Sequence, residues 1–217
     1  MSRIRNIIFD FDGTLVDTAP LIIATMQATI ARLQLPPKSD SQCRATIGLR
    51  LEAVAGALWP QISDISQKYA DTYRLIFETL RSTFSITCFP GVINTLRLLH
   101  DQGCRLAIAS SRSHRSLDEY VDCFDIRHLF DSLIGGDDVS EAKPAPEPVL
   151  KICRTLQWDV AETLVVGDTV FDIGMGRNAG TRTCAVTYGN QNRDELLTAD
   201  PDAVIDSFDE LPDHLTF

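Results

Sequence analysis

The sequence lacks an excess of positive charge, long apolar runs and paired cysteines. Its 217 residues include 20 Lys and Arg against 30 Asp and Glu, a formal net charge of −10. A surface that binds a nucleic-acid duplex needs a basic footprint, so this balance argues against a nucleic-acid partner. No apolar run reaches the length of a membrane span. Near the N-terminus, Asp10 and Asp12 interrupt an apolar run that is too short for a signal segment. We therefore expect a soluble protein with no nucleic-acid or membrane partner.

The six cysteines are scattered, with no CxxC pair and no spacing typical of a zinc site. In a chain of this length that pattern is typical of reduced thiols, so we expect a cytoplasmic protein. The four histidines never cluster, and we expect them to be structural or exposed. Because the chain as a whole is acidic, any anionic small substrate must be held by local cations.

Six short apolar runs are predicted to be strands of one sheet. They are residues 6–9, 105–110, 132–136, 163–168, 183–189 and 203–206. Such nearly unbroken apolar runs suit a parallel sheet that is covered on both faces, and helical patterns such as residues 92–103 lie between them. The alternation predicts an α/β fold with a doubly wound parallel sheet.

One region breaks this alternation. Residues 20–84 contain no convincing strand, whereas segments 20–35, 50–59 and 65–81 are helical by period and are separated by turns at 35–40 and 59–64. We therefore expect a helical-bundle domain at residues 18–87, inserted into an α/β core made of residues 1–17 and 88–217.

The first predicted strand ends in two acids, within "IIFDFDGTLVDT". Asp10 and Asp12 lie two residues apart and could share one side of the chain. Two close carboxylates repel unless a cation lies between them, and a hard divalent ion such as Mg²⁺ suits oxygen ligands. Either acid alone would more often belong to a turn or a helix cap.

Other strand ends and loops add to these two acids. Asp168 ends the run "VVGD" and is followed by Asp172, Ser110 and Ser111 end "AIASS", and Lys143 lies in "EAKPAPEP". In doubly wound sheets such ends meet at one edge, where ligands bind. Acids, hydroxyls and a lysine together suit phosphoryl transfer, in which cations neutralise phosphate oxygens and a carboxylate attacks.

The motifs "DFDGT", "IASS", "KPAPEP" and "GDTVFD" together resemble those of the haloacid dehalogenase superfamily of hydrolases. The stretches "IGGDDVSEAKPAPEPVL" and "PDAVIDSFDEL" are similar to its phosphoglycolate phosphatase branch. The resemblance extends over almost the whole chain. It implies a Rossmann-like core, a helical cap in place of the inserted helices, and a phosphatase that uses Mg²⁺.

The resemblance also implies a role for each matching residue. Asp10 resembles the nucleophile that becomes an aspartyl phosphate. Asp12 resembles the general acid and base, and its backbone carbonyl would also bind Mg²⁺. Asp168 resembles the third metal ligand, and Asp172 is either a ligand through water or an acid that supports the site.

The phosphate-binding pair of the family is matched by Ser110 and Lys143, with Lys143 also restraining the nucleophile. The backbone N–H groups that follow Asp10, at Gly13 and Thr14, could cradle phosphate oxygens. The family often has Asn where this chain has Ser111, whose hydroxyl can still donate a hydrogen bond.

The cap contains one candidate for substrate recognition, in "TIGLRLEAV". Gly48 and Arg50 interrupt the helical pattern together. We expect Arg50, or the backbone beside it, to contact the organic part of the substrate, because Arg can hold a carboxylate through two parallel hydrogen bonds. A solvated arginine at a helix start is the alternative. Arg112 could likewise reach an anionic substrate or belong to a solvated helix start.

Several alternatives to a phosphoglycolate phosphatase stay open. A sugar-phosphate mutase or a pyrophosphatase of the same superfamily would use a similar core, and a non-catalytic binding protein could keep the fold. A dehalogenase needs no metal and lacks an acid at the position of Asp12. We expect a small phosphorylated metabolite as the substrate, with phosphoglycolate the leading guess, and a monomer or homodimer.

Overall fold

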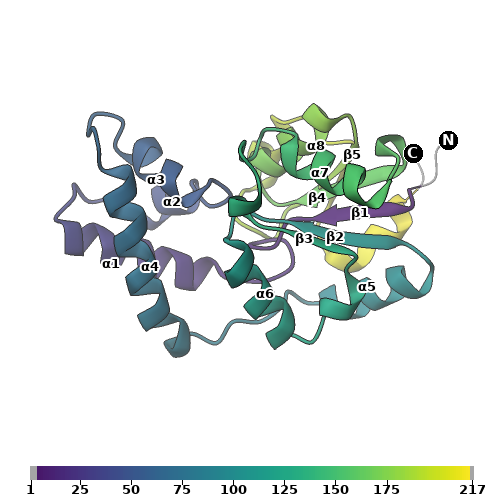
Figure 1. Ribbon diagram of the computed structural model, residues 1–217, viewed down its shortest axis with the longest axis horizontal. Helices are drawn as coiled ribbons and strands as arrows, with labels where there is room; N and C mark the ends of the chain where they lie inside the picture. The colour runs from purple at the N-terminus through teal and green to yellow at the C-terminus, as the bar shows by residue number, and fades with distance from the viewer. Residues whose placement is uncertain (1–3, 216–217) are drawn as a thin grey trace.

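A six-stranded parallel sheet forms the centre of the larger part of the molecule (Figure 1), in a computed structural model that describes residues 4–215. The strands are β1 (Asn6–Phe9), β2 (Arg105–Ala109), β3 (Ser132–Ile134), β4 (Thr163–Gly167), β5 (Arg182–Val186) and β6 (Ala203–Ile205). Their order is β3-β2-β1-β4-β5-β6, and each neighbouring pair is parallel. The predicted α/β fold with a parallel sheet is confirmed.

The sequence patterns extend five of these strands one to three residues too far, to 110, 136, 168, 189 and 206. In each case the extra residues lie in the loop beyond the carboxyl end of the strand. Ser110 and Asp168 therefore belong to loops at the edge of the sheet, beside Asp10 at the end of the central strand β1. This edge is the place where doubly wound folds bind ligands.

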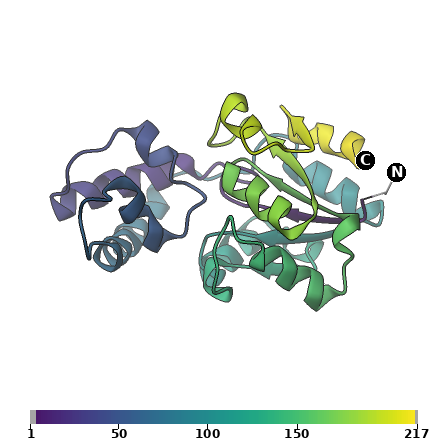
Figure 2. The same ribbon diagram turned by 90° about the horizontal axis from the view of Figure 1, so that it is seen from above.

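Helices cover both faces of the sheet (Figure 2), and alternate strand residues face the two layers. Ile7 and Phe9 of β1 pack with α5 and α6, whereas Ile8 packs with α7 and α8. These helices are α5 (Val92–Asp101), α6 (His114–Cys123), α7 (Glu147–Leu156) and α8 (Val170–Ala179), and a short α9 (Arg193–Leu197) lies near β5 and β6. Burial on both faces explains why the strand sequences are almost continuously apolar.

Residues 19–83, which we call the helical insertion, form a separate lobe beside the sheet edge (Figure 2). Its helices are α1 (Ala19–Leu33), α2 (Asp40–Arg44), α3 (Leu51–Leu58) and α4 (Ser66–Leu80). They share an apolar cluster of their own, built around Met26, Trp59 and Tyr69. The sequence patterns missed α2, which begins at Asp40, the last residue of the predicted turn, where Ser39 and Gln42 form a capping box.

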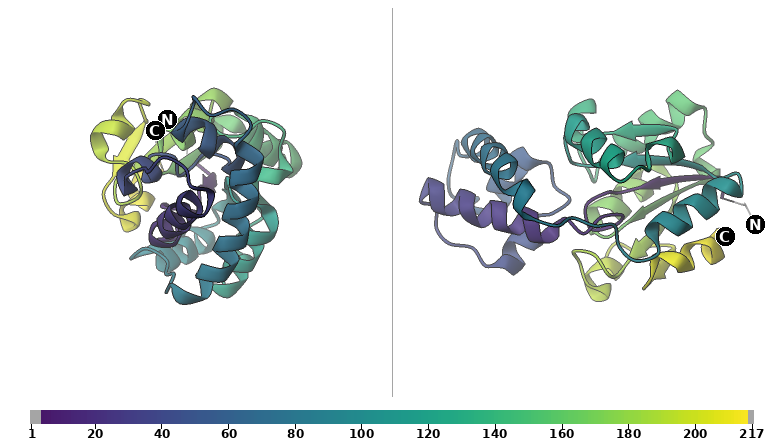
Figure 3. Two further views of the ribbon diagram at one scale, coloured as in Figure 1. Left: turned by 90° about the vertical axis from the view of Figure 1, so that its left-hand side faces the viewer. Right: turned by 90° about the horizontal axis from the view of Figure 1, so that it is seen from below.

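Two neighbouring stretches of chain connect the helical insertion to the sheet (Figure 3, right). Val16 forms an isolated antiparallel bridge with Cys88, and the Asp17 N–H donates to the Thr87 carbonyl at 3.0 Å. The bridge lies at the two predicted boundaries between the core and the cap, which fall between residues 17 and 18 and between residues 87 and 88. That division into two domains stays a prediction.

Candidate active site

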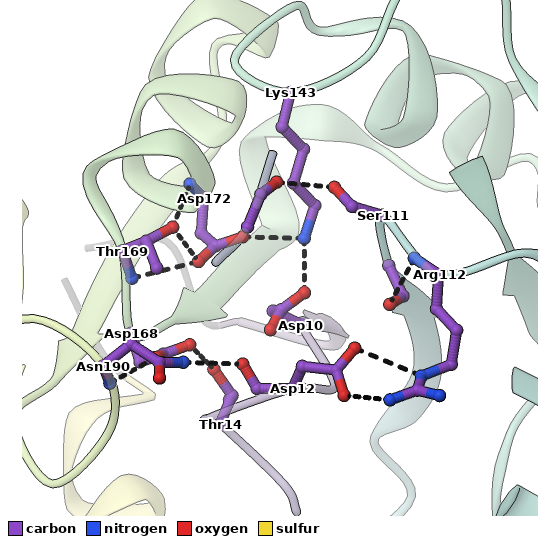
Figure 4. A network of polar contacts seen from close by, with 12 residues as sticks. Asp10, Asp12, Thr14, Ser111, Arg112, Lys143, Asp168, Thr169, Asp172 and Asn190 are labelled. Atoms are coloured by element: carbon purple, nitrogen blue, oxygen red, sulfur yellow. Dashed lines mark hydrogen bonds and ion pairs between the residues drawn. The ribbon is translucent and has the colours of Figure 1, made fainter. Parts of the chain in front are cut away.

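Three buried carboxylates meet at the carboxyl edge of the sheet (Figure 4). Asp10 follows β1, Asp168 follows β4, and Asp172 lies in the first turn of α8. One oxygen atom of each lies within 4.8 Å of the others. Burial raises the pKa of Asp10 well above its ordinary value and that of Asp168 to about 7, and neighbouring acids add to both shifts. A cation would relieve this repulsion, and a set of carboxylate oxygens fits a hard divalent metal ion.

Lys143 is the buried cation of the site. It comes from the loop between β3 and α7, and its Nζ donates to Asp10 Oδ1 at 2.5 Å and to Asp172 Oδ1 at 2.7 Å. Burial alone would lower the pKa of Lys143, but the two carboxylates hold it above its ordinary value. Lys143 is therefore charged, and it fixes one oxygen of Asp10.

Asp172 has its carboxylate fully engaged by the protein. Besides Lys143, it accepts from the backbone N–H of Thr169 at 3.0 Å and from the Thr169 hydroxyl at 2.6 Å, which completes the capping box of α8. Of its two expected roles, the contacts favour that of a supporting acid. Asp172 holds Lys143 in place and anchors the helix that follows β4.

Asp168 is held by two residues from other loops. The Thr14 hydroxyl donates to its Oδ1 at 2.9 Å, and Asn190 donates to its Oδ2 through the backbone N–H at 2.7 Å and through Nδ2 at 2.8 Å. Asn190 Nδ2 also lies 3.2 Å from the Asp12 carbonyl oxygen. This carbonyl, expected to be a metal ligand, therefore lies beside Asp168. Asn190 was not among the predicted site residues, although it directly follows the predicted strand 183–189.

Gly13 and Thr14 make contacts within the protein, and their expected backbone contact with phosphate stays a prediction. The Gly13 N–H donates to the Val16 carbonyl at 2.9 Å, and the fully buried Thr14 hydroxyl is bound to Asp168. Gly13 has φ +98°, and a Cβ there would lie 2.2 Å from Asp168 Oδ2. Glycine is needed here because the backbone turns and approaches the carboxylate closely. These two residues shape the site around Asp168.

The Asp12 side chain points away from the carboxylate cluster (Figure 4). Its Oδ1 accepts from the Thr18 hydroxyl at 2.6 Å and from Arg112 Nη2 at 2.5 Å, and its Oδ2 accepts from Arg112 Nε at 3.2 Å. The expectation of an Asp12 carboxylate within the metal cluster is thus not met, because two donors hold it on the other side of the β1 loop.

Arg112 is neither a solvated residue nor an open anion-binding group. Its side chain is 6% exposed and lies over the rings of Phe11, Phe77 and Tyr120, at 5.8, 5.4 and 4.6 Å from the ring centres. Burial alone would lower the pKa of Arg112, but Asp12 holds it above its ordinary value. The guanidinium is therefore a permanent charged partner of Asp12.

Ser110 and Ser111 follow β2 but act in different places. Ser110 is buried, and its hydroxyl oxygen accepts from the Arg112 N–H at 3.2 Å. The Ser111 hydroxyl donates to the Gly48 carbonyl in the helical insertion at 2.6 Å. Ser110 thus lies at the sheet edge, as a phosphate-binding residue requires, whereas Ser111 joins the edge to the insertion.

Comparisons with known proteins agree with this geometry. The family model described as haloacid dehalogenase-like hydrolase matches residues 7–186. The chain belongs to the haloacid dehalogenase-like hydrolases.

Its relatives include "Probable phosphatase IndB" of Dickeya dadantii, 35% identical over 94% of this chain and 90% of that protein. A phosphoglycolate phosphatase of Salmonella paratyphi A is 29% identical over 97% and 92% of the two chains. The crystal structure of a haloacid dehalogenase-like hydrolase from Bacteroides fragilis superposes with a TM-score of 0.87 at 27% identity, covering 96% of this chain and all of that one. The predicted superfamily, the likeness to phosphoglycolate phosphatases and the enzyme class are confirmed.

Arg50 of this hydrolase joins the helical insertion to the core. It precedes α3, and its Nη2 donates to the backbone carbonyls of Gly136 and of Val139, the latter at 2.8 Å. The alternative of a solvated arginine is therefore wrong. The expected contact of Arg50 with substrate stays a prediction, since the residue also lines the cavity above the sheet edge.

That cavity lies between the helical insertion and the core of the hydrolase and has a volume of about 630 Å³. Asp10 and Asp12 line it on the core side, and residues of α1, α3 and α4 line it on the other. A small organic molecule fits such a volume. Asp10 and Asp12 thus face a space in which a small molecule can lie between the two parts of the molecule.

Proposed function

We propose that this hydrolase is a Mg²⁺-dependent phosphatase that cleaves a small phosphate monoester through an aspartyl phosphate on Asp10. The observation that carries the proposal is the placement of Asp10, a buried carboxylate held by Lys143 beside Asp168 and open to the cavity. A carboxylate so fixed can attack phosphorus without first reorganising, and Lys143 lies where phosphate oxygens would gather.

Two steps complete the proposed reaction. In the first, an Asp10 oxygen bonds to phosphorus while the ester P–O bond breaks, and Asp12, in its protonated form, gives its proton to the leaving alcohol. In the second, Asp12 takes a proton from water as the water oxygen attacks phosphorus and releases Asp10. Asp12 lines the same cavity as Asp10, so it can serve the leaving group and the water in turn.

Asp10, Asp168 and the Asp12 carbonyl are the atoms proposed to hold Mg²⁺. When bound, the ion would offset the negative charge of the phosphate and of the buried carboxylates. Lys143, Ser110 and the loop backbone would hold the remaining phosphate oxygens. Asp172 and Asn190 touch these residues from behind and keep them in position.

The helical insertion is proposed to act as a cap that closes over the substrate. Ser111 and Arg50 already join it to the core through the carbonyls of Gly48 and Gly136. Closure would exclude water from the phosphoryl transfer and bring the insertion against the organic part of the substrate.

The test of the function is Asp10→Asn, with Asp122→Asn on the exposed face of α6 as the matched control. Hydrolysis of 4-nitrophenyl phosphate should fall to background in Asp10→Asn, since an amide is a poor nucleophile, and stay unchanged in Asp122→Asn. Circular dichroism and the melting temperature would establish that both variants fold. Near-normal turnover by folded Asp10→Asn would rule out the assignment, and no turnover in the parent protein would favour a non-catalytic role.

Sugar-phosphate mutase and pyrophosphatase activities are separated from this proposal by product analysis. A mutase would return an isomeric phosphate without releasing inorganic phosphate, and a pyrophosphatase would release phosphate fastest from pyrophosphate. The acids at Asp12 and Asp168 favour these metal-dependent reactions over that of a dehalogenase.

Location and assembly stay predictions. All six cysteines are free thiols in the structure. Within residues 4–215, no helix is long and apolar enough to cross a membrane.

A further inference from the structure

The chemistry of the residues that line the cavity indicates which kind of leaving group fits there. We propose that the hydrolase prefers phosphate esters of neutral, apolar alcohols and disfavours substrates with a second anionic group, phosphoglycolate included. This inference rests on the proposed phosphatase function. It follows from the chemistry of the residues that surround the space beyond Asp10 and Asp12.

The helical insertion offers the cavity a largely apolar wall. Ile22 and Met26 come from α1, Leu49 from the loop before α3, Val54 from α3 and Phe77 from α4. Pockets of this kind bind the apolar part of a ligand and use a few polar groups to orient it. A neutral alkyl or aryl group could be desolvated against this wall without the burial of a charged group.

Two of the four arginines that line the cavity, buried Arg112 and partly buried Arg50, contact other groups of the protein. Arg112 forms its two-point contact with Asp12, and Arg50 donates to two backbone carbonyls. An anionic group on the substrate could recruit Arg112 only by displacing Asp12 and leaving that carboxylate without its partner. Breaking a buried ion pair in this way costs several kcal/mol. Arg112 is therefore not free to hold a carboxylate or a second phosphate, and Arg50 has its Nη2 engaged by the core.

The remaining cations lie at the mouth of the cavity and face acids. Arg74 pairs with Glu52 and is 50% exposed, and Arg115 pairs with Glu119 and is 87% exposed. A cation in water adds little to the binding of an anion, because solvent and salt screen it. Glu78 lies at the same mouth, so the local charge there is not positive.

The charge balance of the whole cavity points the same way. Among the described residues that line it, six carry carboxylates and four carry guanidinium groups, each of the four with a partner in the protein. The phosphate has Lys143 and the metal-binding atoms at the sheet edge, but a second anion would meet an acidic and apolar surface. Burying an unpaired charge there is unfavourable.

The experiment compares benzyl phosphate with 4-carboxybenzyl phosphate, which differ only by a carboxylate far from phosphorus. Because both have alkyl leaving groups, any difference in kcat/KM reports on binding beyond the phosphate. We expect kcat/KM to be about tenfold or more higher for benzyl phosphate, a ratio within reach of one unfavourable contact. Phosphoglycolate, pyrophosphate and ribose 5-phosphate complete the series and should all be poorer substrates.

A variant tests the cause of the preference. Leu49→Lys places a cation in a half-buried part of the wall and should raise the 4-carboxybenzyl to benzyl ratio of kcat/KM by about tenfold. Leu75→Lys is the matched control, because Leu75 lies on the same helical insertion, is 73% exposed and does not line the cavity. It should leave the ratio unchanged. Melting curves would establish that both variants fold.

The outcomes separate this inference from the function on which it rests. If benzyl phosphate is preferred and Leu49→Lys alone shifts the ratio, the inference holds. If 4-carboxybenzyl phosphate or phosphoglycolate is hydrolysed faster, the protein is a phosphatase but the assigned substrate class is wrong. Preference for ribose 5-phosphate overturns the apolar part of the inference. If no ester in the series releases phosphate, the proposed function fails instead.

Discussion

Replacing Arg112 with methionine should destabilise the protein through Asp12. Methionine keeps the apolar contacts with the surrounding rings but removes the guanidinium from a carboxylate that is only 15% exposed. Asp12 would keep the Thr18 hydroxyl as its donor and could gain some water. The change therefore belongs just below the range of about 3–5 kcal/mol for broken buried ion pairs, at about 2–3 kcal/mol.

Thermal unfolding would measure this loss. In a chain of this size each kcal/mol lowers the melting temperature by about 2–4 °C, so Arg112→Met should melt about 5–10 °C below the parent. Arg115→Met is the control, because Arg115 is highly exposed and its i,i+4 pair with Glu119 contributes about 0.5 kcal/mol or less. Its melting temperature should shift by no more than about 2 °C.

A double-mutant cycle isolates the ion pair from the packing. Arg112→Met, Asp12→Asn and the double variant together should give a coupling energy of about 2 kcal/mol, because the double variant no longer contains an unpaired buried charge. A coupling energy below about 0.5 kcal/mol would refute the reasoning. It would mean that Arg112 stabilises the protein through the rings of Phe11, Phe77 and Tyr120 alone.

Three further predictions concern the site and its surroundings. Asp12→Asn should lower the rate of hydrolysis of alkyl phosphates by about 10²- to 10⁴-fold. The rate for 4-nitrophenyl phosphate should fall much less, since nitrophenolate leaves without a proton. An equal loss for both substrates would point to a structural role of Asp12. Mg²⁺ at about 100 times its Kd should stabilise the protein by about 2.7 kcal/mol, and Asp168→Ala should remove most of that gain, whereas full activity in excess chelator would exclude the metal site. Burial alone would raise the pKa of Asp138, but the Gly135 N–H and His114 lower it below its ordinary value. The ionised Asp138 side chain therefore stabilises the fold at any pH above its pKa in the unfolded chain. This stabilisation disappears as the pH falls through the pKa of Asp138 in the folded protein. Asp138→Asn should therefore lower the melting temperature at pH 7 but not at about pH 2, and a loss that persists in acid would contradict the assignment.

The sequence predicted the sheet because its strands are buried on both faces and so read as apolar runs. The same property made their ends hard to place, since apolar and small residues continue into the loops, as in the run to Gly189. Asp10 and Asp168 could be found because charged residues at the ends of apolar runs stand out, and Lys143 because it lies in the family-like motif "KPAPEP". The carboxyl ends of parallel strands then brought them together.

The partners of these residues could not be predicted in the same way. Asn190 and Thr14 hold Asp168 across large distances in the sequence, and neither type of residue is unusual in a loop. Arg112 looked like a solvated helix start because the rings that bury it come from three separate segments, including α4 of the helical insertion. The pairing of Arg112 with Asp12 depends on tertiary contacts that no local pattern encodes.

The bridge between Val16 and Cys88 brings together the two ends of the helical insertion where they join the core. Because Asp17 and Thr87 are neighbours, the chain leaves and returns at one point, and the helices between them can lengthen, shorten or be exchanged without moving β1 or α5. A differently shaped pocket can therefore arise in this fold while the carboxylates at the sheet edge keep their positions.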